Sequence, residues 1–300
     1  MERVILHDDL TFSRIIHGLW RLVEWNMSKE EVVHFIESCL EMGVTTFDHA
    51  DIYGGYTCEE RFGEALALKP SLRENMQIVT KCGIKLMNPN RPPQKLHYYD
   101  SSKNHIVTSV DSSLQKLRTD YIDVLLIHRP DYLMDSTEVA EAFRELHATG
   151  KVRHFGVSNF TPSQFDLLQS YLDKPLVTNQ LELSAGNFDL FQNGTVDHCM
   201  LHRVKPMAWS PLNGGAIFTS QTEKHVRLRN TLMDVAKEIG ASSIEQVLYA
   251  WLLMHPAQIM PIAGSGKLER VALAVDSLSL QLTRENWYEI LRASIGKDVD

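Results

Sequence analysis

Cysteine is scarce in this sequence, and its spacing matches no common cysteine chemistry. Four cysteines are scattered through 300 residues, and no two of them form a C-x-x-C pair. This spacing argues against a disulfide framework and against a zinc site. We therefore expect reduced thiols, as in a cytoplasmic protein, and no bound metal.

Long apolar runs and an excess of positive charge are also missing. The most apolar stretches, such as Ile122–Ile127, are interrupted by a charge and are far too short to cross a bilayer. The first ten residues contain no apolar segment typical of a secretory signal. The net charge of −8 argues against nucleic acid or an anionic membrane as the main partner. We expect a cytoplasmic monomer.

The sequence does contain a regular alternation of short apolar runs and amphipathic stretches. Apolar residues make up 44% of the chain and charged residues 23%, which is enough to bury a full core beneath a charged surface. Continuous apolar runs are typical of parallel strands that are covered on both faces. Eight such runs are present: Ile15–Ile16, Thr45–Phe47, Gln77–Thr80, Ile122–Ile127, Val152–Val157, Leu176–Asn179, Val204–Ala208 and Gln258–Ile262.

The stretches between these runs carry helix signals. Ser28–Glu31 and Thr161–Gln164 are capping boxes. Two helical patterns, Thr231–Ile239 and Ser243–Met254, precede the last apolar run, and a final one covers Arg284–Ile295. We predict one α/β domain over residues 1–300, a (β/α)8 TIM barrel with an extra helix before the last strand and a C-terminal helix. A doubly wound parallel sheet is the structural alternative.

Charged and polar residues stand where the predicted strands end. In (β/α)8 enzymes the C-terminal ends of the strands build the active site. Asp48, Lys81 and His128 follow the second, third and fourth predicted strands, so we expect their side chains to meet at one mouth. Tyr53 follows Asp48 by five residues, on the loop that leaves the second strand.

Tyr53 gains a chemical role from these neighbours. A free tyrosine has a pKa of about 10, too high for a good acid–base group at neutral pH. A nearby ammonium favours the phenolate, so we expect Lys81 to lower the Tyr53 pKa. Asp48 can hold Lys81 charged, and His128 can direct a carbonyl oxygen toward the phenol. The alternative is a loop tyrosine packed on the glycines that follow it, beside a purely structural ion-pair group.

These residues belong to a longer series of motifs that resembles the aldo-keto reductase family. Lys81 stands in V-T-K-C-G and His128 in L-I-H-R-P-D. The likeness continues in G-V-S-N-F at 156–160, N-Q at 179–180 and W-S-P-L at 209–212. The motifs keep the family's order and spacing over nearly the whole chain. The resemblance implies an NADP(H)-dependent oxidoreductase that reduces small aldehydes or ketones, with hydride from the nicotinamide and a proton from Tyr53.

The resemblance also implies a cofactor lying extended across the barrel mouth. Ser158, Asn159 and Gln180 would bind the nicotinamide carboxamide, and Trp209 would stack on the nicotinamide ring. Taken alone, Trp209 fits the core equally well, and the glycines after it fit a simple turn. The loop after the seventh strand would approach the pyrophosphate through Ser210, Leu212 and Gly214.

The segment after the last strand is a candidate phosphate site. Gly264 and Ser265 precede a predicted helix, and backbone N–H groups at a helix N-terminus favour phosphate. By resemblance, Lys267 and Arg270 bind the adenosine 2′-phosphate, which selects NADP(H) over NAD(H). Taken alone, these two cations are a solvated helix start.

Other parts of the predicted site are particular to this chain. Many relatives have Glu-Asn shortly after the arginine, where this chain has Leu273 and Ala274, so the usual adenine contacts are not predicted. Substrate specificity is expected from loops, and the residues that we single out there are Trp20, Trp25, the insertion Leu86–Asn104, Phe188 and Phe191.

Two other functions are compatible with the same residues. An NADPH-binding regulatory or redox-sensing subunit would hold the cofactor and turn over slowly. A lyase or isomerase barrel would use Lys81 to form a Schiff base. The presence of all four residues Asp48, Tyr53, Lys81 and His128 favours carbonyl reduction.

Overall fold

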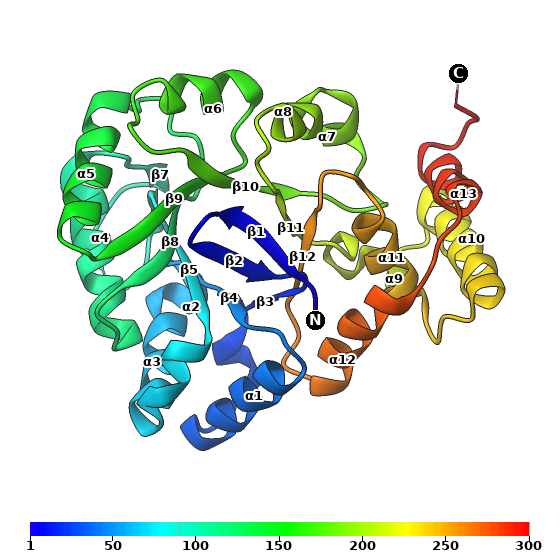
Figure 1. Cartoon of the computed structure of the whole chain (residues 1–300), viewed down its shortest axis with the longest axis horizontal. Coiled ribbons are helices and arrows are strands. Elements are labelled where there is room, and N and C mark those ends of the chain that lie inside the picture. Colours follow the sequence, from blue (N-terminus) through cyan, green and yellow to red (C-terminus); the bar gives the residue numbers. More distant parts are fainter. Residues whose placement is uncertain (90, 300) are drawn as a thin grey trace.

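Eight parallel strands close into a barrel in the computed structural model, which describes residues 1–89 and 91–299 (Figure 1). The last strand pairs with the first through Ile262 and Ile16, so the sheet has no free edge. Closure confirms the predicted (β/α)8 barrel and excludes the doubly wound sheet. In order around the barrel, the strands are β3 (Ile16–Gly18), β4 (Thr46–Asp48), β5 (Gln77–Cys82), β8 (Ile122–Ile127), β9 (Val152–Ser158), β10 (Leu176–Glu182), β11 (Met207–Trp209) and β12 (Met260–Ala263).

Helices surround this barrel, and the two additions predicted from the sequence are present. α10 (Glu223–Ile239) is the extra helix before the last strand, and it lies beside the C-terminal helix α13 (Arg284–Ile295) (Figure 1). No helix of the described residues is long and apolar enough to span a membrane. The other long helices are α1 (Lys29–Glu41), α3 (Cys58–Leu68), α4 (Lys103–Leu117), α5 (Ser136–Ala148), α6 (Pro162–Gln169), α8 (Thr195–Leu201), α11 (Ile244–Leu253) and α12 (Leu268–Asp276).

The helix ends follow from local sequence. At the start of α1 the Ser28 hydroxyl accepts from the Glu31 N–H, and the Glu31 carboxylate accepts from the Ser28 N–H. Thr161 and Gln164 form the same reciprocal pair at the start of α6. Both capping boxes are therefore confirmed, and each satisfies backbone donors that a helix leaves without partners at its first turn.

Two small antiparallel ribbons were not predicted. β1 (Arg3–His7) and β2 (Leu10–Ser13) form a hairpin that covers the barrel end nearest the viewer in Figure 1. Leu10 and Phe12 of this hairpin pack against the barrel interior and close it with apolar side chains. The second ribbon pairs β6 (Ile84–Lys85) with β7 (Tyr98–Tyr99), so the Leu86–Asn104 insertion is less irregular than expected. Its Asn90 lies outside the described residues.

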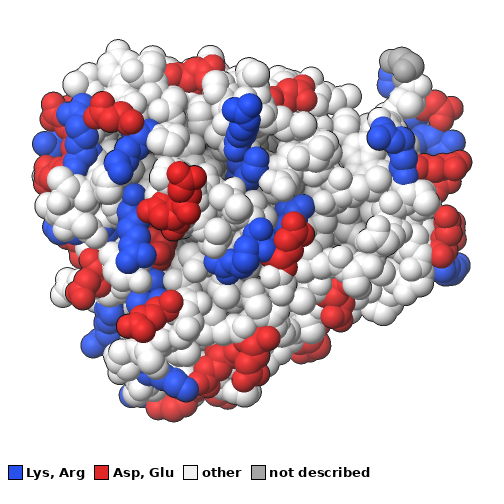
Figure 2. Space-filling view, in the orientation of Figure 1, with Lys and Arg blue, Asp and Glu red and all other residues white. Residues whose placement is uncertain are grey.

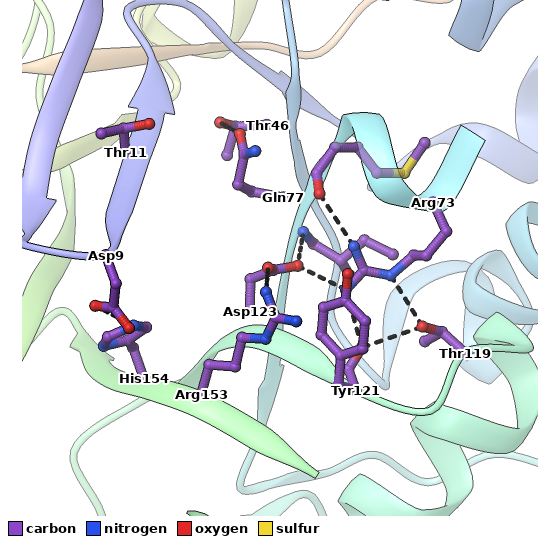
Figure 3. Close-up of polar contacts among 12 residues, drawn as sticks. Asp9, Thr11, Thr46, Arg73, Gln77, Thr119, Tyr121, Asp123, Arg153 and His154 are labelled. Carbon is purple, nitrogen blue, oxygen red and sulfur yellow. Dashed lines mark hydrogen bonds and ion pairs between the residues drawn. The ribbon is translucent and has the colours of Figure 1, made fainter. Parts of the chain in front are cut away.

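The same end of the barrel carries a polar network around Asp123, the charge that interrupts strand β8. Arg73 donates to the Asp123 carboxylate at 2.7 Å, and the backbone N–H of Ile78 donates at 2.9 Å (Figure 3). The Tyr121 ring lies between the guanidinium groups of Arg73 and Arg153, at 3.9 and 3.7 Å. These partners explain how a charge is tolerated inside an apolar strand.

The surface of this end carries charges of both signs. Lysine and arginine alternate with aspartate and glutamate in small groups over the face that holds the hairpin (Figure 2). The described residues of this face therefore form no continuous basic surface.

Candidate active site

A cavity of about 760 Å³ opens at the opposite end of the barrel, where the strands have their C-terminal ends. Polar side chains from the strand ends form its floor, and the loops after β3, β11 and β12 form its walls. Of the fifteen site residues predicted from the sequence, thirteen line the cavity: Asp48, Tyr53, His128, Ser158, Asn159, Gln180, Trp209, Ser210, Leu212, Gly214, Gly264, Ser265 and Arg270. The other two are Lys81, which lies buried behind the floor, and Lys267.

Lys81 lies at the centre of the polar contacts behind the cavity floor. Its ammonium donates to both carboxylate oxygens of Asp48 at 2.8 Å, to the backbone carbonyl of His49 at 2.6 Å and to the Tyr53 hydroxyl at 3.1 Å. The side chain is fully buried. Burial acts to lower the pKa of Lys81, but its interactions with Asp48 and Tyr53 outweigh burial and the pKa is raised. Lys81 is therefore cationic at neutral pH.

The Tyr53 phenol lies in the same buried environment. Burial raises the pKa of Tyr53 above its ordinary value, and Lys81 acts against this rise without cancelling it. The expectation that Lys81 gives Tyr53 a lowered pKa is therefore wrong in its net direction, because the cost of burying a phenolate exceeds the attraction of the ammonium. Tyr53 keeps its proton at neutral pH.

His128 stands beside Tyr53 at the end of β8. The two rings meet edge to face, with their centroids 5.9 Å apart. Burial, together with the charges of Lys81 and Arg129, holds the pKa of His128 well below its ordinary range. The imidazole is therefore neutral at physiological pH, and it can donate only one N–H.

A second group of polar residues lies across the floor from Tyr53. The Gln180 amide donates to Asp48 at 2.7 Å, which joins this group to the Lys81 ion pair. The Ser158 hydroxyl donates to the backbone carbonyl of Gln180 at 3.0 Å, and the Trp209 indole N–H donates to the side-chain oxygen of Asn159 at 3.0 Å. The strand ends β9, β10 and β11 thus supply one connected set of donors and acceptors.

Unusual backbone conformations gather at this edge of the cavity. Asn159 and Ser210 have φ of 60° and 51°, in the left-handed region that residues other than glycine rarely adopt. Gly214 and Gly215 also have positive φ, and a Cβ at either position would meet nothing within 4 Å. Open, strained backbone is typical of sites where a ligand approaches the main chain closely.

The far end of the cavity agrees only in part with the predicted phosphate site. Arg270 lines it and lies 3.9 Å from Glu245, whereas Lys267 stands exposed at the start of α12. Ala274 is buried in an apolar cluster with Ile15 and Tyr249, so it has no access to a ligand.

Several residues were misjudged or missed from the sequence. Trp20 lines the cavity as expected, but Trp25 packs on Phe35 in the core. Phe188 and Phe191 stack on each other away from the cavity. All four aromatic residues follow predicted strands, and this position does not distinguish an aromatic residue that packs on the core from one that lines the cavity. The cavity is also lined by residues that were not predicted from the sequence, among them Arg21, Arg129, Glu245 and Tyr249. Of these four, only Arg129 had a signal, because it directly follows His128.

Comparison with known proteins identifies the class of this barrel. The profile of the aldo/keto reductase family matches residues 14–295, and the chain belongs to that family. It is an oxidoreductase of a family that acts on carbonyl and alcohol groups with nicotinamide cofactors.

Individual relatives agree with this assignment. The chain is 57% identical to the uncharacterized oxidoreductase YcsN of Bacillus subtilis, and the match covers 100% of both chains. It is 44% identical, again over 100% of both chains, to a 6-dehydroglucose reductase of Agrobacterium fabrum. Among solved structures, the glycerol dehydrogenase of Gluconobacter oxydans superposes with a TM-score of 0.83 at 25% identity, covering 97% of this chain and 95% of that one.

A buried acid, Asp51, lies two residues before Tyr53 on the same loop. The backbone N–H of Asp51 donates to the Lys81 carbonyl at 3.0 Å, and the Ser109 hydroxyl donates to its carboxylate at 2.8 Å. Burial, with the nearby Glu59, raises the pKa of Asp51 to about 7. This residue ties the loop that carries Tyr53 to strand β5 and helix α4.

Asp51→Asn should change how stability depends on pH. The folded-state pKa of Asp51 lies above its unfolded value of about 3.8, so its contribution is present below that value and is lost as pH rises toward 7. The variant cannot ionise, so it should gain stability relative to the wild type by up to about 4 kcal/mol between about pH 4 and pH 8. Urea unfolding of both proteins across this range measures the difference. A difference that does not change with pH would contradict the raised pKa.

Proposed function

We propose that this protein reduces aldehydes or ketones to alcohols with NADPH, and that Tyr53 donates the proton. The observation that carries the proposal is the contact of 3.1 Å between the Tyr53 hydroxyl and the buried Lys81 ammonium, which Asp48 holds in place. Burial keeps the phenol protonated before the reaction, and the ammonium stabilises the phenolate that forms in it.

The cavity suits a nicotinamide cofactor. Ser158, Asn159 and Gln180 carry the hydroxyl and amide groups that a carboxamide can bond, and Trp209 supplies a large aromatic face beside them. The loop of Gly214 and Gly215 leaves space for a phosphate to approach the backbone. When bound there, the reduced cofactor supplies the hydride that reaches the carbonyl carbon.

The proton step belongs to the residues of the chain. The carbonyl oxygen gains negative charge as its carbon is reduced, and the O–H bond of Tyr53 breaks as the proton moves to that oxygen. Lys81 then holds the phenolate. His128, which is neutral, can donate one hydrogen bond to the same oxygen and so fix its position beside Tyr53. The alcohol leaves, and solvent returns the proton to Tyr53.

The charge state of Lys81 disfavours the Schiff-base alternative. A lysine that attacks a carbonyl must lose its proton, which requires a lowered pKa. Here the pKa of Lys81 is raised, and the ammonium has Asp48, Tyr53 and the His49 carbonyl as partners. A borohydride adduct on Lys81 is therefore not expected.

The substrate is proposed only as a class. Cavity residues near Tyr53 combine apolar faces, from Trp20, Ile52 and Ile84, with the cations Arg21 and Arg129. One relative is named a 6-dehydroglucose reductase, so a glucose-derived carbonyl compound belongs in a test panel beside simple aldehydes and ketones.

Tyr53→Phe should abolish carbonyl reduction while leaving NADPH binding intact. Removal of a general acid costs about 10²- to 10⁴-fold in rate. We would measure NADPH oxidation with the substrate panel, and NADPH binding by fluorescence. Tyr132→Phe is the matched control, because Tyr132 is 91% exposed and lies outside the cavity. Full turnover in the Tyr53 variant would disprove the assignment.

Lys267→Ala and Arg270→Ala should each weaken NADPH binding much more than NADH binding. A charge-assisted hydrogen bond is worth about 1.5–3 kcal/mol, so each loss should raise the dissociation constant for NADPH by about tenfold or more. Arg284→Ala removes an exposed cation on α13 and should change neither constant. Equal losses for both cofactors would show that these residues do not bind the 2′-phosphate.

A further inference from the structure

A cluster of two histidines and one aspartate lies on the outer ring of helices, away from the cavity. His198 lies in α8, His202 is the C-cap residue of that helix, and Asp166 belongs to the neighbouring helix α6 (Figure 1). The two histidines are four residues apart, and the His202 N–H donates to the His198 carbonyl at 3.1 Å. Residues at this spacing lie on one face of a helix, one turn apart.

The three side chains converge on one point. The Nε2 atoms of His198 and His202 lie 2.8 and 3.4 Å from the same oxygen, Oδ1 of Asp166. In a tetrahedral zinc site with bonds of about 2.0–2.1 Å, ligand atoms are separated by about 3.3 Å. The His202–Asp166 spacing is close to that value, and all three ligand atoms lie within 4.8 Å of one another. The shorter His198–Asp166 contact is a hydrogen bond, which a metal ion would replace by moving the two side chains slightly apart.

Packing holds the imidazoles in this orientation. The His198 ring meets the Phe165 ring edge to face at 5.2 Å, and the two histidine rings lie 4.4 Å apart. His198 is 10% exposed, whereas His202 and Asp166 are 40% and 53% exposed. One ligand is thus anchored against the protein, and the open side leaves room for water to complete the coordination.

From this geometry we propose that His198, His202 and Asp166 form a binding site for a divalent transition metal, with Zn²⁺ as the reference ion. Two imidazoles and a carboxylate are ligands that Zn²⁺ accepts readily, and Ni²⁺ and Cu²⁺ favour imidazole as well. Each histidine coordinates through Nε2 as the neutral tautomer, so its proton lies on Nδ1. The bound ion links α6 to α8, two helices that follow consecutive barrel strands.

A second cluster offers a natural comparison. His7, Asp9 and His154 meet at the hairpin end of the barrel, with His154 Nε2 3.2 Å from Asp9 Oδ1 (Figure 3). The cavity beside them also contains Arg153, Asp123 and Lys174. Arg153 is paired with Asp123 at 3.6 Å, and the positive charge of Lys174, which acts on His154, repels a dication. We therefore assign the metal site to the α6–α8 cluster alone.

The test is titration of the untagged, chelator-treated chain with ZnCl₂ by calorimetry, beside thermal melts with and without zinc. We expect one equivalent of Zn²⁺ and a higher melting temperature. His202→Ala should weaken binding by at least about tenfold, because losing even an outer-shell partner of a metal costs about 10- to 100-fold. His202 is 40% exposed, so the variant should fold, which circular dichroism checks.

Two further variants decide the assignment. Asp166→Asn should weaken binding in the same way as His202→Ala, while His154→Ala should leave both affinity and stoichiometry unchanged. Zinc that fails to bind the wild type would overturn the proposal. Binding that survives His202→Ala but disappears in His154→Ala would overturn it too, since it would place the ion at the hairpin end.

Discussion

The buried ion pair of Lys81 and Asp48 is the interaction on which the rest of the site depends. Both residues come from neighbouring parallel strands, β5 and β4, and both side chains are almost completely buried. Leaving one charge of such a pair without its partner costs about 3–5 kcal/mol. The pair is stable here because the ammonium donates to the Asp48 carboxylate, the His49 carbonyl and the Tyr53 hydroxyl. The Gln180 amide also donates to the Asp48 carboxylate from the opposite side of the floor.

The ion pair also decides what Tyr53 can do. In the absence of any cation, burial would make its phenolate prohibitively costly; without burial, the phenol would be an ordinary surface group. The structure combines burial with a nearby cation, and burial has the stronger effect on the pKa of Tyr53. The proposed acid is thus protonated at rest, and the ammonium matters most when the proton has left. Asp51 supports this geometry, because its hydrogen bonds fix the Tyr53 loop to strand β5 and helix α4.

The sequence was sufficient for the barrel because its strands are buried on both faces. The run Ile122–Ile127 matches strand β8 residue for residue, and the other seven runs overlap their strands. A closed parallel sheet requires this kind of apolar continuity. Asp48, Lys81 and His128 could be placed because strand ends in a barrel share one mouth. The N-terminal hairpin and the β6–β7 ribbon were missed, since they lie outside the strand–helix alternation from which the barrel was predicted.

Other features depend on tertiary packing, which the sequence does not display. Trp20 and Trp25 are five residues apart, yet only Trp20 faces the cavity. Glu245 reaches the cavity from α11 because that helix lies beside α12. His198 of α8 meets Asp166 and Phe165 of α6 through side-chain contacts that the sequence does not display. The net pKa of Tyr53 was misjudged for a similar reason. Its neighbours could be named in advance, but the extent of its burial could not.

Single-turnover kinetics of the Lys81→Met variant test most directly whether the Lys81 ammonium makes Tyr53 an effective acid. NADPH oxidation would be followed by stopped flow with saturating aldehyde, after circular dichroism and NADPH binding have shown that the variant is folded. The account predicts a hydride-transfer rate at least about 10²-fold below that of the wild type. A folded variant that transfers hydride at the wild-type rate would contradict it.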